Sequence, residues 1–273
     1  MIAFPNCKIN IGLNIVAKRS DGFHDIETIF YPLSLCDALE VLPSTKQDGE
    51  DEFILEGMLL DGDPHQNLCM KALRLMRSVV NIDPVKMVLL KKIPSGAGLG
   101  GGSADAAFAL KMLNAYCNAG LSDDQLKGLA AQLGSDCSFF ITDIPAYAHG
   151  KGDLLEKAIV NLQGYTLVLV KPPVFVSTAD AYSGVTPALS TLSLKTLIQQ
   201  PISTWQHTIK NDFEKNIFLH YPIIATIKEK MYNMGALYAS MSGSGSSVFG
   251  IFDHPVNGAH LFLDCFYHEE LFK

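Results

Sequence analysis

The sequence has no long hydrophobic run and no excess of basic residues. Its 273 residues contain no stretch near the ~18 apolar residues of a membrane-spanning helix, and MIAFPNCKIN at the start lacks the basic and apolar regions of a signal peptide. We therefore expect a cytoplasmic protein with no membrane partner. A formal net charge of −7 argues against a nucleic-acid partner, because a nucleic-acid coat needs a dominating basic surface.

Paired cysteines are also absent. The cysteines show no Cys-x-x-Cys pair and no matching Cys/His spacing, and they lie far apart along the chain: Cys7, Cys36, Cys69, Cys117, Cys137 and Cys265. This distribution argues against a disulfide framework and against a zinc site, and it favours reduced, mostly buried thiols. We expect no protein-bound metal.

The elements that can be read from the sequence mix strands and helices without regular alternation. Residues 8–16 alternate apolar and polar positions, which predicts a half-buried strand with Lys8 and Asn10 on its polar face. Helical spacing is found in 67–80, 103–117, 122–134 and about 223–234, and further strands are predicted in 26–35, 85–93, 165–171, 236–241 and 247–252. This order predicts an α+β fold.

The length of the chain suits one large domain or two medium ones. The pattern loosens at about 150–164, and YTLVLVKPP then begins a new strand. We therefore place a domain boundary here and expect two domains, 1–155 and 156–273.

Residues 93–107 read IPSGAGLGGGSADAA, a glycine-rich loop followed by an almost wholly apolar helix. Successive glycines let backbone N–H groups surround a phosphate, and a helix N-terminus adds about half a positive charge. No lysine occurs between Lys92 and Lys111, so the loop is not a Walker P-loop. An anion-binding loop is our preferred interpretation, and a flexible connector is the alternative.

Two other glycine motifs fit less well. Gly96, Gly98 and Gly101 satisfy G-x-G-x-x-G, but Asp123 and Asp124 open a helix where a dinucleotide site needs an acid at the end of a strand. A protein kinase would need HRD and DFG sequences, and neither is present. A nicotinamide-dependent oxidoreductase therefore stays only as an alternative.

A phosphate loop without lysine needs charged partners elsewhere. Lys8 on the first strand is a candidate cation, and Asp136, in the turn after the helix of 122–134, is a candidate base or magnesium-linked acid. Each also has a structural explanation, since edge-strand lysines discourage aggregation and aspartates commonly cap turns.

Three separated blocks resemble the motifs of the kinase superfamily named for galactokinase, homoserine kinase, mevalonate kinase and phosphomevalonate kinase (GHMP). They are PNCKINIGLNIVAKRSDGFHDIETIF, then IPSGAGLGGGSADAA with the later LGSDCSFF, and finally SMSGSGSSVFGIF. The resemblance covers nearly the whole chain in consistent order. It implies a two-domain α+β fold, with an N-terminal domain like domain 2 of ribosomal protein S5 and a ferredoxin-like C-terminal domain.

The resemblance also implies an ATP site. ATP is the co-substrate, and Mg2+ is bound mainly through its phosphates. Asn67 and Lys91 fall where the family approaches the adenosine. The phosphates are expected on the glycine loop and the start of the next helix, at Pro94, Ser95, Gly96, Ala97, Gly98, Leu99, Gly100, Gly101, Gly102 and Ser103.

Asp136 would take the proton from the acceptor hydroxyl, and Lys8 would stabilise the developing charge, while Asn10 would hold the acceptor. The D-G-F-H turn most closely resembles the members that phosphorylate the 2-hydroxyl of 4-diphosphocytidyl-2-C-methyl-D-erythritol, in the non-mevalonate route to isoprenoid precursors. The small-molecule substrate would then carry cytidine diphosphate. Its pyrimidine would be bound by His24 and by three aromatic residues, Phe23, Tyr31 and Tyr182.

Some features leave alternatives open. Phe23 replaces the commoner tyrosine of this turn, which removes a phenol but keeps a stacking surface. Tyr31 and Tyr182 are equally typical of core packing. The second glycine loop, with Gly243, Ser244 and Gly245, is expected to approach the first from the other domain, although a plain hairpin turn has the same composition. Another GHMP kinase acting on homoserine or a mevalonate-type acceptor, or a non-catalytic nucleotide-binding module, remains possible; we expect a monomer or weak homodimer.

Overall fold

The structure is a computed structural model that describes residues 1–46, 49–58, 63–188 and 192–273. The chain forms two compact units. The first comprises 1–7, 32–95 and 100–144, and the second comprises 8–31, 96–99 and 145–273. The long strands β2 (Asn6–Lys18) and β3 (His24–Cys36) therefore run from one unit into the other.

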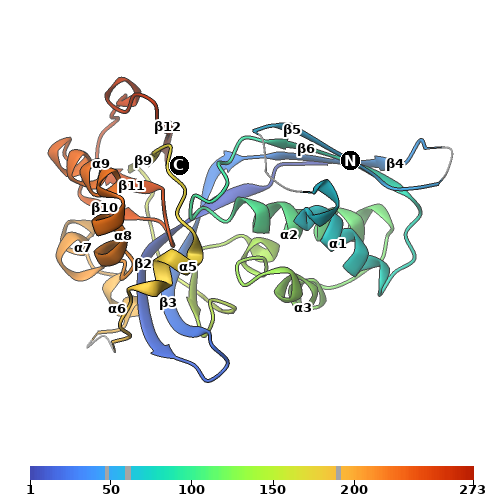
Figure 1. Ribbon diagram of the computed structural model, residues 1–273, viewed down its shortest axis with the longest axis horizontal. Coiled ribbons are helices and arrows are strands. Elements are labelled where there is room, and N and C mark those ends of the chain that lie inside the picture. The colour runs from blue at the N-terminus through green and yellow to red at the C-terminus, as the bar shows by residue number, and fades with distance from the viewer. Residues whose placement is uncertain (47–48, 59–62, 189–191) are drawn as a thin grey trace. The chain divides into compact units, whose positions relative to one another are not determined.

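The first unit is a sheet with helices on one side (Figure 1). The strand order is β1 (Ile2–Ala3), β4 (Ala38–Pro43), β6 (Val85–Lys91) and β5 (Glu52–Gly57); β5 pairs parallel with β6, and the other pairs are antiparallel. The helices are η1 (Pro64–Gln66), α1 (Leu68–Arg77), α2 (Gly101–Tyr116), α3 (Asp123–Leu133) and α4 (Phe139–Thr142).

Helix α2 is the central helix of this unit. Its alanines and leucines are buried on nearly every side, because α1, α3 and α4 all pack against it. Helix α3 begins with the capping box predicted for Ser122 and Gln125, in which each side chain bonds the other residue's backbone N–H. These contacts confirm the helices that the hydrophobic spacing predicts for this region.

The second unit contains two four-stranded sheets. One has the order β2, β3, β7 (Ala146–His149) and β8 (Leu154–Lys157). The other is antiparallel, with the order β10 (Tyr238–Met241), β11 (Val248–Phe252), β9 (Thr166–Lys171) and β12 (Phe266–Leu271). The helices of the unit are α5 (Thr178–Ser183), α6 (Leu194–Leu197), α7 (Ile202–Thr208), α8 (Glu214–His220), α9 (Pro222–Asn233) and η2 (Ala259–Leu261).

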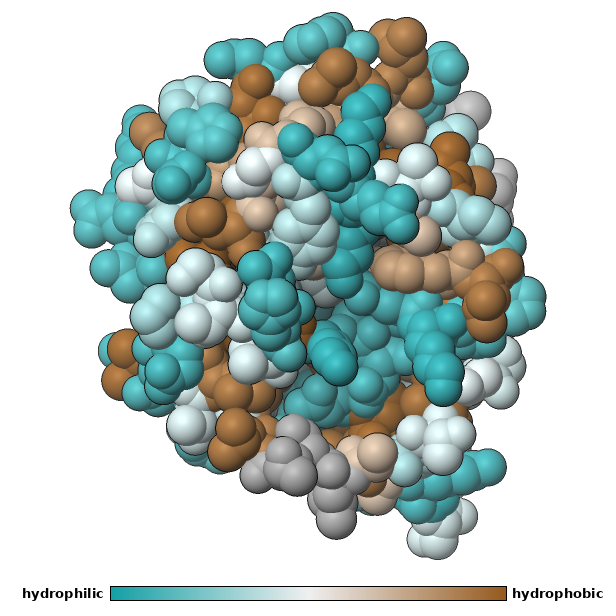
Figure 2. All heavy atoms as spheres, turned by 90° about the vertical axis from the view of Figure 1, so that its left-hand side faces the viewer, coloured by the Kyte–Doolittle hydropathy of each residue, from teal (hydrophilic) through white to brown (hydrophobic). Residues whose placement is uncertain are grey.

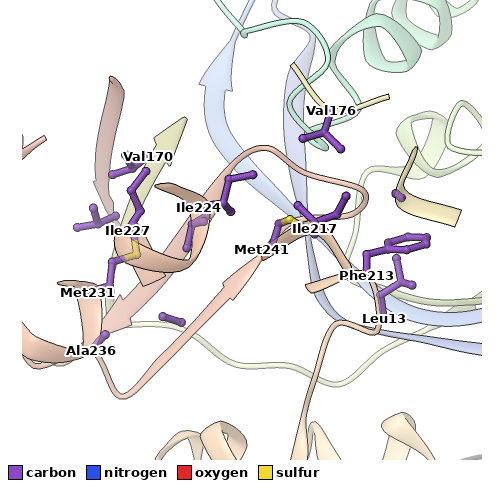
Figure 3. Close-up of a cluster of buried hydrophobic side chains, with 14 of the residues drawn as sticks. Leu13, Val170, Val176, Phe213, Ile217, Ile224, Ile227, Met231, Ala236 and Met241 are labelled. Atoms are coloured by element: carbon purple, nitrogen blue, oxygen red, sulfur yellow. The ribbon is translucent and has the colours of Figure 1, made fainter. Parts of the chain in front are cut away.

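The core of the second unit lies between the β9–β12 sheet and helices α8 and α9 (Figure 3). Ile224, Ile227 and Met231 recur at helical spacing along α9 and are buried against the sheet. Phe213 lies beside Leu13 of β2 in the same cluster. This apolar packing fixes the positions of β2 and of the segment that precedes α8.

Hydrophobic and hydrophilic side chains are interspersed over the face shown in Figure 2, on the side where α7 and α9 lie in Figure 1. Scattered exposed apolar residues of this kind are ordinary for a folded surface. Across the described ranges, no helix is both long and apolar enough to cross a bilayer.

Candidate functional site

Lys8 and Asn10 lie in the buried first part of β2. The strand predicted here is confirmed, but the half-burial predicted for it is wrong for residues 6–13, which are buried on both faces. Lys8 Nζ donates to Asn10 Oδ1 at 2.5 Å and to Gly98 O at 3.3 Å, and it lies 4.8 Å from the centre of the Phe30 ring. Asn10 Nδ2 donates to Thr28 Oγ1 at 2.9 Å. The polar face is therefore covered by protein, and its groups are held in fixed positions.

The loop before α2 turns its carbonyl groups toward the protein. Ala97 O, Gly98 O and Leu99 O accept hydrogen bonds from Ser247 N, Ser242 Oγ and Lys8 N, at 3.2, 2.8 and 3.0 Å. Among the residues that the structure describes, no acceptor is found for the amide N–H groups of 96–100. A loop with bonded carbonyls and available N–H groups is suited to an anion.

Two backbone conformations make this loop possible. Gly96 and Gly98 have φ of +57° and +72°, a region that residues with a Cβ rarely adopt. A Cβ on Gly98 would also lie 1.9 Å from Ser242 O. The loop leads directly into α2, whose first turn carries no side-chain cap. The helix N-terminus therefore keeps its N–H groups and its partial positive charge for a ligand.

The second glycine loop joins the first at Ser242. Ser242 Oγ donates to Gly98 O and accepts from Asn10 N at 3.1 Å. The position that a Cβ would take on Gly243 is 3.1 Å from Asn10 Oδ1. The structure thus brings Gly98, Ser242 and Asn10 together, and all three residues belong to the second unit. Gly245 is buried, and Ser244 is half-buried between the two glycines.

His24 and Tyr182 stack, with ring centroids 4.8 Å apart and planes at 23°. Tyr182 also meets the edge of the Phe213 ring. Phe23 is 57% exposed, and Lys151 Nζ lies 5.1 Å from its ring centre. Tyr31 is in a different place: it packs edge-on against Phe272 at 5.2 Å, and burial raises its pKa. The structure therefore brings His24 and Tyr182 together and places Tyr31 against Phe272, and a contact of Tyr31 with the pyrimidine stays a prediction.

Lys91 is enclosed in the first unit by two acids. Its side chain is 2% exposed, and its Nζ pairs with Asp37 and, at 2.8 Å, with Asp105. Burial lowers the pKa of Lys91, but the two carboxylates outweigh burial and raise it overall. Burial also raises the pKa of Asp105 to about 7. Lys91 thus joins β6 to α2, and an approach of Lys91 to ATP stays a prediction.

Asn67 and Asp136 also belong to the first unit. Asn67 caps α1, where its Oδ1 accepts from Cys69 N at 2.9 Å. Asp136 is half-buried in the turn between α3 and α4. The next residue, Cys137, is hydrogen-bonded to Ser103 in the first turn of α2, and burial raises the pKa of its thiol to about 11. The turn that carries Asp136 is therefore attached to the helix start that the glycine loop leads into.

Comparison with known proteins identifies the family to which the chain belongs. Family models described as "GHMP kinases N terminal domain" and "GHMP kinases C terminal" match residues 67–151 and 193–263. A Bacteroides fragilis protein named 4-diphosphocytidyl-2-C-methyl-D-erythritol kinase is 52% identical over 254 residues, covering 92% of each chain. A protein of that name from Parabacteroides distasonis is 49% identical and covers 97% of each. The chain belongs to the GHMP kinase family.

Solved GHMP kinases have the same fold. A crystal structure of 4-(cytidine 5'-diphospho)-2C-methyl-D-erythritol kinase matches with a TM-score of 0.82 and 28% identity over 98% of both chains. The Methanococcus jannaschii mevalonate kinase matches with a TM-score of 0.69 over 98% of this chain and 97% of the other, at 15% identity, which shows the fold alone. The two-domain α+β GHMP fold and the small-molecule kinase activity expected from the resemblance are therefore confirmed.

Several groups of this GHMP kinase site could not be identified from the sequence. Thr28 and Asn211 are buried and polar, and both bond to parts of the site. Thr28 lies in an apolar strand, and Asn211 lies in a short polar turn between two helices. Neither has a spacing or motif that points to the glycine loops. Within the described ranges, no group of three or more His, Cys, Asp or Glu could hold a metal ion.

Proposed function

We propose that this GHMP kinase transfers the γ-phosphate of ATP to the 2-hydroxyl of 4-diphosphocytidyl-2-C-methyl-D-erythritol, giving the 2-phosphate and ADP. The names of its relatives support this substrate. The observation that carries the phosphate site is the loop of residues 96–99, with carbonyls bonded to protein and amide N–H groups available. We place the step in non-mevalonate isoprenoid precursor biosynthesis, in the cytoplasm.

The ATP phosphates are proposed to bind the segment from Pro94 to Ser103 through the backbone N–H groups of residues 95–103, including the first turn of α2. N–H groups suit phosphate oxygens, and they do not suit a metal ion. Mg2+ is therefore proposed to be held mainly by the ATP phosphates, where it neutralises charge. Asn67 and Lys91 are proposed on the adenosine side, and Gly243, Ser244 and Gly245 support the phosphate loop from the second glycine loop.

Lys8 and Asp136 are proposed to act on the same acceptor hydroxyl. Asp136 accepts the hydroxyl proton as the oxygen attacks the γ-phosphorus, and the Lys8 ammonium stabilises the negative charge that develops. Asn10 orients the Lys8 ammonium through its Oδ1 and contacts the acceptor. Phosphoryl transfer depends mainly on such positioning and electrostatic stabilisation.

His24 and Tyr182 are proposed to bind the cytosine. A stacked histidine and tyrosine offer a flat aromatic surface, and His24 adds hydrogen-bonding atoms for the pyrimidine edge. Phe23 supplies an exposed ring without a phenol. Tyr31, which packs edge-on against Phe272, is proposed as a further aromatic contact of the pyrimidine.

The matched family segments lie on either side of residue 155, which supports domains of 1–155 and 156–273. We propose a monomer or weak homodimer that acts on its small-molecule substrate without nucleic acid or membrane.

The test is acceptor-dependent ADP formation by the purified protein. With ATP and Mg2+, we expect turnover with 4-diphosphocytidyl-2-C-methyl-D-erythritol and only background with homoserine or mevalonate. Turnover with homoserine or mevalonate alone would replace the proposed acceptor. ATP binding without turnover of any acceptor would identify a nucleotide-binding module.

A further inference from the structure

We infer that Asn211 is a positioning residue for phosphoryl transfer: its side-chain amide sets the place of Ser242, and through Ser242 that of the Gly98 carbonyl and of β2. This inference rests on the proposed function. Asn211 touches neither ATP nor acceptor in this account. It lies in the segment 211–214, Asn-Asp-Phe-Glu, between α7 and α8 of the second unit.

Each polar atom of the Asn211 side chain has a defined partner. Its Nδ2 donates to Met241 O and to Gly243 O, both at 2.8 Å, and its Oδ1 accepts from Phe213 N at 3.0 Å. The side chain is buried. Only an amide can donate to two carbonyls while accepting from an N–H in this arrangement, so the chemistry fixes both the residue type and its orientation.

The two carbonyls flank Ser242, whose hydroxyl connects Asn10 N with Gly98 O. The contact leaves little room for movement, because the space between Gly98 and the Ser242 backbone is too small for a methyl group. A Cβ on Gly98 would lie 1.9 Å from Ser242 O. A displacement of Ser242 is therefore transmitted to the phosphate loop. It also reaches Lys8, because the Lys8 ammonium donates to the same Gly98 carbonyl.

The segment itself is anchored independently of the Asn211 amide. Asp212 N donates to Leu13 O at 2.9 Å, and Asp212 Oδ2 accepts from Ile15 N at 2.7 Å, both on β2. Phe213 is packed in the core beside Leu13 (Figure 3). Removing the Asn211 donors should consequently disturb the glycine loop without releasing the segment.

Glu214 makes a second anchor, on β10. Its Oε1 accepts from Met241 N at 2.8 Å and from Ser240 Oγ at 3.1 Å, and its Oε2 pairs with Lys228 at 2.6 Å. Glu214 therefore fixes the end of β10 at Ser240 and Met241. The Asn211 amide fixes the residues that follow, through its hydrogen bonds to Met241 O and Gly243 O. Asn211 is thus the group of this segment that acts on the loop itself.

Asn211→Asp tests this role most directly. The variant keeps the shape and the oxygen that accepts from Phe213 N, so Phe213 and its contact with Tyr182 are preserved. It replaces the two donated hydrogen bonds by an oxygen facing two carbonyls. We expect kcat/KM for ATP to fall about 10- to 100-fold and the ATP Kd, from thermal shifts, to rise. The calorimetric Kd for the cytidine acceptor should stay within about 2-fold, because its aromatic surface is unchanged.

Asn114→Asp is the matched control. The Asn114 side-chain amide also forms hydrogen bonds with backbone groups, since it donates to Leu121 O at 3.0 Å and accepts from Leu121 N at 2.9 Å. Asn114, however, lies near the end of α2 in the first unit. We expect a lower melting temperature with unchanged ATP Kd and kcat/KM. Equal kinetic losses in both variants, or unchanged ATP kinetics in Asn211→Asp, would overturn the inference. An equal loss of affinity for the acceptor and for ATP in Asn211→Asp would also overturn it, because that result would indicate a general loss of structure in the second unit.

Ser242→Ala is the second variant, for the case in which Asn211→Asp does not fold. It removes only the hydroxyl that connects Asn10 N with Gly98 O. The ATP Kd should again rise while the acceptor Kd stays within about 2-fold, and an unchanged ATP Kd would overturn the inference. In the double variant the loss should exceed the larger single loss by no more than about 3-fold, because both act through one loop. Wild-type turnover separates the two claims: an inactive wild type with an intact ATP response refutes the acceptor, while the ATP Kd still tests Asn211.

Discussion

Gly98→Ala should disable the phosphate loop by forcing it away from Ser242. The added Cβ would lie 1.9 Å from Ser242 O, where ordinary contact begins at 3.4 Å, so the loops must separate by about 1.5 Å. The position also has φ of +72°, which costs a residue with a Cβ roughly 1–2 kcal/mol. Overpacking against backbone adds about 1–3 kcal/mol. Since a misplacement of about 1 Å can lower a rate 100-fold, we expect kcat/KM for ATP to fall at least about 100-fold.

Gly120→Ala separates the two causes. Gly120 has φ of +70°, nearly the same backbone conformation, but nothing lies within 4 Å of the Cβ that it would gain. This variant should lose only the roughly 1–2 kcal/mol of backbone strain and keep wild-type kinetics. Urea unfolding gives the stability of each variant, and ATP-dependent thermal shifts with steady-state rates give function. If Gly98→Ala matched Gly120→Ala in both measurements, the close approach of the two loops would be refuted.

The remaining predictions concern the base, a buried acid and the aromatic pair. Asp136→Asn should lower kcat about 10²- to 10⁴-fold while ATP still raises the melting temperature, and unchanged turnover would remove Asp136 as the base. Burial raises the folded-state pKa of Asp105 to about 7, above its ordinary 3.8, so folding takes up a proton and stability falls as pH rises from about 4 to 7, by at most about 4 kcal/mol. Asp105→Asn should flatten that dependence in urea titrations at pH 5 and 8, and an unaltered slope would contradict it. Tyr182→Leu should raise KM for the cytidine acceptor about 3- to 10-fold and leave KM for ATP unchanged; equal changes in both would count against stacking.

Local patterns predicted most of the elements that carry the site. The capping box at Ser122, the apolar helix after the glycine loop and the strands of 236–241 and 247–252 all depend on neighbouring residues, which the sequence displays directly. For the same reason the sequence could suggest that the glycine loop binds an anion, and that role stays a prediction. Its missing lysine pointed to charges elsewhere in the chain.

Contacts between distant segments could not be predicted in the same way. Alternation on β2 indicated one polar, solvated face, but the two glycine loops cover that face and bury Lys8. The role of Asn211 depends on a contact with a loop about thirty residues away, and no local pattern encodes it. Tyr31 was one of three aromatic candidates for the pyrimidine site, and its edge-on contact with Phe272 could not be predicted from the sequence.

The charge of Lys91 illustrates a further limit. The family resemblance implies that Lys91 approaches the adenosine of ATP, and that approach stays a prediction. The structure places two acids from separate segments, Asp37 and Asp105, against its ammonium group. A buried lysine needs such partners, and the sequence does not show that Asp37, between β3 and β4, and Asp105, on α2, lie at the end of β6.

The most direct test of the account is phosphorus NMR of the product formed from ATP and 4-diphosphocytidyl-2-C-methyl-D-erythritol by the purified protein. We expect one new phosphomonoester on the 2-hydroxyl for each ADP released, and loss of that signal with Asp136→Asn. Absence of the phosphomonoester while ADP forms with homoserine or mevalonate, or phosphate on a different hydroxyl, would contradict it.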